Sequence, residues 1–155
     1  MIALVQRVLE ASVTIDGIET ARIGGGTLAL VGVERDDTEA EAARLAERLL
    51  AFRMFADEAG RMNLDVVAAG GGLLLVPQFT LAADTRRGRR PGFSTAAEPG
   101  RARALFEHFH GQLGGRVTLV RTGTFGAHMR IGSINDGPVT FRLRSAPSGS
   151  PDALA

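Results

Sequence analysis

The spacing of hydrophobic residues changes several times along this 155-residue chain, and the order of those changes limits the fold more than any other feature. Residues 2–33 alternate in the manner of strands, with turns at Asp16-Gly17 and at Gly24–Gly26. The chain then takes up a helical period, which opens with a capping box formed by Thr38 and Glu41. The first third of the sequence therefore predicts a β meander followed by a helix.

The remaining residues predict further strands and one more helix. Residues 73–76 form a short continuous apolar run that ends at Pro77, which is typical of a buried strand. Because proline removes a backbone donor, we expect the Gly137-Pro138 pair to separate two strands. We expect a helix at residues 99–113, with Pro99 in its first turn, and strands at residues 116–120, 128–134 and 139–144.

This order of elements predicts an α+β fold, with a small barrel-like, antiparallel-rich sheet flanked by two helices. We assign residues 1–144 to this single domain. Residues 145–155 are small, polar and proline-containing, so we expect a disordered C-terminal tail. No run has the length of a membrane span or the layout of a signal peptide, which predicts a soluble, cytoplasmic protein.

The composition excludes several kinds of chemistry. The chain has no Cys, Lys, Trp or Tyr, and all 18 of its basic residues are Arg, so thiol nucleophiles, lysine Schiff bases and phenolic acids are ruled out. His108 and His110 lie two residues apart on the predicted helix and therefore point away from each other, unlike a zinc-binding pair. We expect neither a metal nor a cofactor.

A basic cluster stands out because the formal net charge of the chain is only +1. The planar guanidinium group of Arg suits phosphate groups, so this cluster is a candidate nucleic-acid contact. A solvated, Arg-rich loop explains the same residues equally well. The cluster consists of Arg86, Arg87, Arg89, Arg90, Arg101 and Arg103, with only Glu98 opposing them.

The segment that follows the predicted buried strand is a candidate for catalysis. A chain that leaves a strand end often presents main-chain N–H groups to a ligand, here those of Gln78, Phe79 and Thr80. The hydroxyl of Thr80 could also act as a nucleophile, although no base is near it in the sequence. A strand end with a capping Thr remains an equally open interpretation.

Taken together, four segments resemble the D-aminoacyl-tRNA deacylases of the D-tyrosyl-tRNA(Tyr) deacylase family, from Met1 to about Leu143. Two motifs make the resemblance specific. The family's S-Q-F-T-L corresponds to residues 77–81, and its N-x-G-P-x-T to residues 135–140. The four segments are "MIALVQRVLEASVTIDG", "RMFADEAGRMNLDV", "QFTLAADTRRGRRPGFS" and "GTFGAHMRIGSINDGPVTF".

The resemblance implies a homodimer that removes D-amino acids from tRNA, with active sites at the interface. Gly137-Pro138, a cis pair in the family, would lie over the Gln78-Phe79 loop of the partner, as a wall that rejects L-aminoacyl esters and admits D-aminoacyl and glycyl esters. Oxyanion donors would be the main-chain N–H of Phe79 and that of Gln78 or Thr80. The 2′-OH of the tRNA would assist the attacking water, and no cofactor would be needed.

The resemblance also assigns binding roles, for which core packing or solvent exposure is the open alternative. Arg7 would hold the Gly-Pro segment in place. Asn135 and Thr140 belong to the substrate-binding motif. Phe125 and Met129 match positions that line the pocket for the terminal adenosine. The residues that would meet the phosphates of the tRNA acceptor end are Arg86, Arg87, Arg89 and Arg90.

One departure from the family is Pro77, which stands where the first motif begins with serine. Proline removes a hydroxyl and an N–H at the head of the pocket loop. A related animal deacylase that acts on L-alanyl-tRNA also has proline there, with a trans Gly-Pro bond. The alternatives that remain are therefore an L-alanyl-tRNA-type deacylase, a non-catalytic RNA-binding barrel and a small structural dimer.

Overall fold

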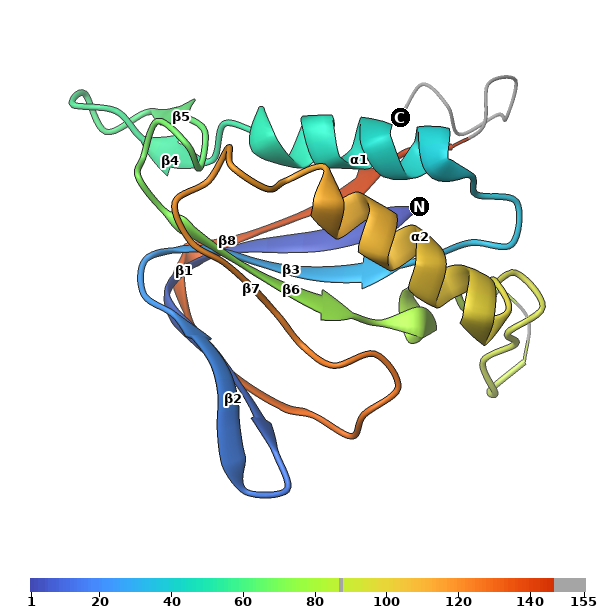
Figure 1. Ribbon diagram of the computed structural model, residues 1–155. Helices are drawn as coiled ribbons and strands as arrows, with labels where there is room; N and C mark the ends of the chain where they lie inside the picture. The colour runs from blue at the N-terminus through green and yellow to red at the C-terminus, as the bar shows by residue number, and fades with distance from the viewer. Residues whose placement is uncertain (87, 147–155) are drawn as a thin grey trace.

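The computed structural model describes residues 1–86 and 88–146; Arg87 and residues 147–155 lie outside the described residues. Figure 1 shows both α-helices on the same side of the sheet, with the hairpin of the first two strands extending away from them. The elements are β1 (Ile2–Ile15), β2 (Ile18–Ile23), β3 (Gly26–Gly32), α1 (Glu39–Leu50), β4 (Phe55–Ala56), β5 (Met62–Leu64), β6 (Gly72–Pro77), the 3₁₀ helix η1 (Phe79–Ala82), α2 (Pro99–Gly111), β7 (Val120–Thr122) and β8 (Arg130–Arg144).

Strand β1 forms the middle of the main sheet. Along one edge it pairs antiparallel with β3 through Ile2–Val8 and with β2 through Ala11–Ile15, and along the other edge it pairs with β8. Strand β3 continues the sheet through parallel pairing with β6, which pairs in parallel with β7. The result is a small α+β fold with a nearly closed, barrel-like mixed sheet, as the coarse prediction had it.

The predicted meander is wrong in its pairing. A meander would place β3 beside β2, whereas the order in the sheet is β2-β1-β3. The reason is the length of β1, which has 14 residues against 6 in β2. The hairpin partner covers only the last part of β1, so its first seven residues remain free to pair with β3.

The apolar run of β6 is buried on both of its faces. Leu73 and Leu75 pack into the cluster between the sheet and the two helices, together with Leu45 and Phe109. Leu74 and Val76 pack into a second cluster inside the curled sheet. A strand covered on both faces and paired in parallel on both edges has no solvent-facing positions, which explains the absence of alternation.

Both helices begin where the sequence predicts. Thr38 caps α1, and its capping box with Glu41 is complete. Burial opposes ionisation of Glu41, but hydrogen bonds from Thr38 and the charge of Arg44 lower the pKa of its carboxyl. Pro99 occupies the first turn of α2, which ends at Gly111. No helix in the described part of the chain is both long enough and apolar enough to cross a membrane.

Two strand predictions near the C-terminus need correction. The strand expected at residues 116–120 is displaced, because Arg116 still bonds back to Leu113 in the turn after α2 and β7 begins only at Val120. The strands expected on either side of Gly137-Pro138 are one continuous strand, β8. The proline is accommodated by a bulge, since Gln6 pairs with Thr140 and Val8 with Asn135. Asp136–Val139 therefore lie opposite Arg7 alone.

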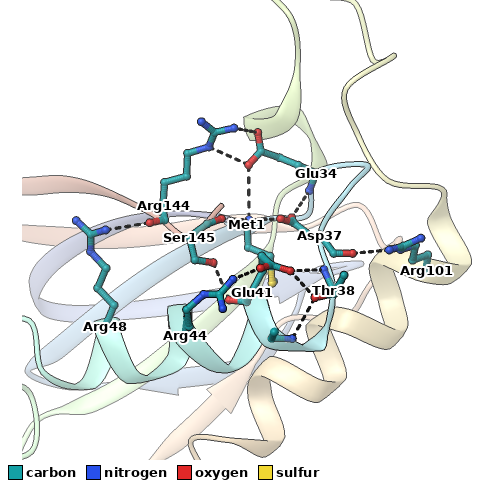
Figure 2. Close-up of polar contacts among 11 residues, drawn as sticks. Met1, Glu34, Asp37, Thr38, Glu41, Arg44, Arg48, Arg101, Arg144 and Ser145 are labelled. Carbon is teal, nitrogen blue, oxygen red and sulfur yellow. Dashed lines mark hydrogen bonds and ion pairs between the residues drawn. The ribbon is translucent and has the colours of Figure 1, made fainter. Parts of the chain in front are cut away.

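The α-ammonium group of Met1 is fully buried among acceptors from three segments (Figure 2). It donates hydrogen bonds to Asp37 Oδ1 (2.5 Å) and to the carbonyl of Ser145 (2.6 Å), and Glu34 Oε2 lies 3.6 Å away. Ser145 and Ala146 are themselves buried. The expectation of a disordered tail is therefore wrong for these two residues, and the rest of that tail lies outside the described residues.

Asp37 extends this network to the helices and to β8. Its Oδ2 accepts the N–H of Glu34 (2.6 Å), and its carbonyl accepts a hydrogen bond from Arg101 of α2 (2.6 Å). Glu34 in turn forms two hydrogen bonds with Arg144, at 2.7 and 3.0 Å. Burial raises the pKa of the Asp37 carboxyl, and the Met1 ammonium group opposes that shift.

We predict that Asp37→Ala will lower the free energy of unfolding by about 3–5 kcal/mol, because it leaves a buried ammonium group without its main partner. The measurement is urea denaturation followed by circular dichroism. Glu19→Ala is the control, since it breaks an exposed ion pair with Arg22 and should change stability little. Equal effects of the two substitutions would contradict the structural role of Asp37.

Candidate active site

The candidate catalytic loop begins where β6 ends. The N–H of Gln78 donates to the carbonyl of Val31 in β3 (2.7 Å), so this N–H is occupied. The first hydrogen bond within η1 runs from Leu81 N–H to the Gln78 carbonyl (3.2 Å). The N–H groups of Phe79 and Thr80 precede that bond and have no partner within the described residues. Of the three predicted donors, the geometry thus leaves Phe79 and Thr80 and excludes Gln78.

The side chain of Gln78 has a different task, because its Nε2 donates to the hydroxyl of Thr80. No other hydrogen-bond partner of that hydroxyl occurs in the described part of the chain. An amide is not a base, and Thr80 therefore has no neighbour that could remove its proton. The arrangement favours Thr80 as a fixed part of the loop over Thr80 as a nucleophile.

An apolar pocket of about 260 Å³ opens beside η1. The ring of Phe79, which is 58% exposed, lies against that of Phe93, with 5.0 Å between the ring centroids. The guanidinium carbon of Arg103 lies 5.1 Å from the centre of the Phe125 ring, within range of a cation–π contact. The residues that line the pocket are Pro77, Phe79, Ala97, Pro99, Ala102, Phe125 and Gly126.

Met129 lies near the same end of β6 but does not line the pocket. A Cβ atom on Gly123 would come within 2.7 Å of Met129 Sδ and 3.6 Å of the Pro77 ring, so the two side chains meet at this glycine. The half-buried Met129 packs against the cluster inside the sheet. Phe125 thus lies at the pocket, as predicted, whereas Met129 supports it from behind.

The Gly137-Pro138 segment is held from β1. Arg7 Nε donates to the carbonyl of Asp136 (3.1 Å) and pairs with its carboxylate (3.0 Å), while Arg7 Nη1 donates to the carbonyl of Met54 (2.9 Å). The Gly137-Pro138 bond is cis. Gly137 has φ +144°, and a Cβ atom there would approach Val139 Cγ2 to 2.5 Å. Only glycine fits this position.

Asn135 and Thr140 flank the bulge, and their side chains are hydrogen-bonded to each other (3.1 Å). Neither Gly137 nor Pro138 lines the apolar pocket. The sheet register explains this separation: Pro77 lies opposite Val31, which lies opposite Ala3, four residues along β1 from Arg7. Four residues correspond to about 13 Å along the strand, and three strand spacings of about 4.8 Å lie across it. A single chain therefore keeps its two motifs apart.

The basic cluster is only partly available for ligands. Arg86 donates two side-chain hydrogen bonds to Asp84 (2.9 and 2.8 Å), and these hold the pKa of the Asp84 carboxyl well below its usual range. Arg89 and Arg90 are exposed and form no hydrogen bond or ion pair with any described residue. Arg87, the fourth predicted phosphate contact, lies outside the described residues.

Within the described ranges, no group of three or more His, Asp or Glu side chains is placed to hold a metal ion. The chemistry that the site itself offers consists of two main-chain donors, an apolar pocket and a rigid Gly-Pro segment. These features recur in the two motifs that the sequence analysis singled out.

Residues 4–144 match the model of the family described as D-Tyr-tRNA(Tyr) deacylase. The chain belongs to this family. It is 61% identical over 147 residues to the D-aminoacyl-tRNA deacylase of Thioalkalivibrio sulfidiphilus, covering 95% of this chain and 99% of that protein. It is 55% identical over 150 residues to the D-aminoacyl-tRNA deacylase of Alkalilimnicola ehrlichii, covering 97% of this chain and 100% of that protein.

Two solved structures share the fold. One, named c-Myc DNA Unwinding Element Binding Protein, has a TM-score of 0.90 and 36% identity, covering 94% of this chain and 99% of that one. The other, described as a probable eukaryotic D-amino acid tRNA deacylase, has a TM-score of 0.77 and 16% identity, covering 92% and 98%. The second likeness concerns the fold alone. Membership of the deacylase family identifies the protein as an enzyme.

Sequence reasoning about this deacylase missed several residues around the pocket. Phe93 was visible only as part of the aperiodic loop, and its contact with Phe79 depends on how that loop folds back. Arg103 was counted as a member of the basic cluster, without its aromatic partner. Pro99 was interpreted as a helix start, which it is, but it also lines the pocket. The helical spacing from Pro99 to Ala102 could have suggested that both face the same side.

We predict that Gly137→Ala will lower the free energy of unfolding by about 1–3 kcal/mol, because alanine is strained at this φ and its Cβ meets Val139. Denaturant unfolding measures the loss. Gly24→Ala serves as the control, since no atom lies within 4 Å of the place its methyl group would take and its φ is not positive. A Gly137→Ala protein as stable as the control would show that the bulge is not fixed as described.

Proposed function

We propose that this deacylase hydrolyses the ester bond of D-aminoacyl-tRNA, releasing the free D-amino acid and tRNA. The observation that carries the proposal is the pair of unpartnered N–H groups of Phe79 and Thr80 beside the apolar pocket. They lie on the first motif that this chain shares with the deacylases it resembles. The names of its relatives, at 61% and 55% identity, support the same substrate class.

The two donors suit an oxyanion. When water attacks the ester carbonyl, negative charge develops on its oxygen, and fixed N–H groups stabilise that charge without reorganising. The loss of one such donor costs roughly a hundred- to a thousandfold in other enzymes. Aminoacyl esters are already activated, so placement and charge stabilisation can suffice, with the 2′-OH of the terminal adenosine positioning the water.

The Gly137-Pro138 segment of a second copy completes the site in this proposal. Both residues are exposed, and the register keeps them apart from the catalytic loop of their own chain. Large apolar side chains are also exposed on these strands: Leu9 is 57% exposed, Ile134 50% and Phe141 37%. Such a surface suits a homodimer, in which the bulge of each subunit lies over η1 of the other.

Selectivity follows from stereochemistry. D and L residues held by the same amino and carbonyl groups differ only in where the hydrogen and the side chain point. A wall of main-chain atoms at Gly137 and Pro138 excludes the L side chain. Glycine has no side chain to collide with that wall, so the enzyme also cleaves glycyl-tRNA.

The rest of the tRNA end contacts the surface around the pocket. The terminal adenine lies against Phe125 in the apolar pocket, where stacking contributes without reading a sequence. Arg89 and Arg90 meet phosphates of the acceptor end, and Arg87 belongs to the same proposal. We place this reaction in the cytoplasm, with residues 1–144 as the catalytic domain.

The direct test is time-resolved deacylation of D-tyrosyl-, L-tyrosyl-, glycyl- and L-alanyl-tRNA by the purified protein. We expect cleavage of the D-tyrosyl and glycyl esters, with L-tyrosyl-tRNA intact. Cleavage of L-alanyl-tRNA would show that Pro77 changes the specificity. Binding of charged and uncharged tRNA without turnover of any ester would replace the proposal with an RNA-binding role.

A second prediction separates RNA-assisted catalysis from a Thr80 nucleophile. Because the only described partner of the Thr80 hydroxyl is the Gln78 amide, Thr80→Ala should keep most of the activity. A substrate that ends in 2′-deoxyadenosine should lose most of it. Single-turnover rates with both substrates decide the matter, and the opposite pattern would make Thr80 the nucleophile.

A further inference from the structure

The bulge in β8 is closed by a side chain of its own strand. Asn135 Oδ1 accepts the N–H of Val139 (2.7 Å), and Asn135 Nδ2 donates to the carbonyl of Val139 (3.3 Å). This pair of bonds imitates the pairing that a neighbouring strand would offer. Asp136, Gly137 and Pro138 are thereby enclosed in a loop whose two ends are tied together.

The amide of Asn135 has no N–H left for a ligand. Its second Nδ2–H donates to the hydroxyl of Thr140 (3.1 Å), which uses both donors of the group. The same hydroxyl accepts a hydrogen bond from Gln6 Nε2 of β1 (3.2 Å). Asn135 and Thr140 were predicted to bind substrate, but in this structure their polar atoms connect the loop to β1.

The two sides of the loop are thus fixed by different residues. Arg7 holds the outgoing carbonyl and the carboxylate of Asp136. Asn135 holds Val139 directly after the proline. Without Asn135, Arg7 would still hold the first residue of the loop, but Val139 would lose its side-chain hydrogen bonds and the Gly-Pro carbonyls would be free to move.

We propose that Asn135 is a positioning residue that sets D-over-L selectivity by fixing the Gly137-Pro138 segment. This inference rests on the proposed function, in which that segment is the wall that the L side chain meets. A wall excludes a side chain only if it does not yield. A displacement of about 1 Å in a positioned group can change rates on the order of a hundredfold, so a loosened loop should admit L-aminoacyl esters.

The experiment measures kcat/KM for D-tyrosyl- and L-tyrosyl-tRNA with the wild type and with Asn135→Ala. The ratio of the two values should fall by at least about tenfold, a change that a loss of global stability would not produce. Asn135→Asp keeps the acceptor for Val139 and should lie between them. Asn63→Ala, on the exposed strand β5, is the matched control and should keep the wild-type ratio. If Asn135→Ala does not fold, Thr140→Val replaces it, since it removes the anchor of the amide alone.

Amide hydrogen exchange at Val139, followed by NMR, tests the same clamp without any substrate. Exchange should be at least about tenfold faster in Asn135→Ala than in the wild type. A folded variant that keeps both the wild-type ratio and the wild-type exchange rate would overturn the inference. A wild-type protein that cleaves neither ester would defeat the proposed function instead, and the exchange rates would still decide whether Asn135 fixes the loop.

Discussion

The pairing of β1 along both of its edges is the constraint on which the rest of the structure depends. One edge carries β3, and through it β6 and the loop with the two free N–H groups. The other edge carries β8, whose bulge is tied to β1 through Arg7 and Gln6. Each half of the candidate site is therefore fixed relative to the same strand, and the network around Met1 holds the start of that strand in place.

The sheet that positions the two motifs also separates them. Within one chain they face different parts of the surface, so neither the donors nor the wall forms a complete site alone. A second copy with its bulge over η1 resolves this without new chemistry. The account also explains why a chain without Cys, Lys or a catalytic triad can hydrolyse an ester: the work falls to main-chain groups, whose positions are set by hydrogen bonds rather than by side-chain pKa values.

Much of this could be predicted from the sequence. Helix starts at Thr38 and Pro99, and the buried strand before Pro77, follow from local rules. The order of strands could not, because β1 pairs with three partners and its length becomes decisive only in the folded sheet. Nor could β8 be recognised as one strand, since the Asn135 side chain compensates for the missing donor of Pro138. Likewise, the loss of Gln78 as a donor depends on a bond to Val31, which is remote in sequence.

The most direct test of the central claim is a crystal structure with a non-hydrolysable D-tyrosyl-adenosine analogue, linked by an amide in place of the ester. The account predicts the carbonyl oxygen of the ligand within hydrogen-bond distance of the Phe79 or Thr80 N–H, and the Gly137-Pro138 segment of a second copy against its α-carbon. A ligand bound away from η1, or a site closed by residues of a single chain, would contradict it.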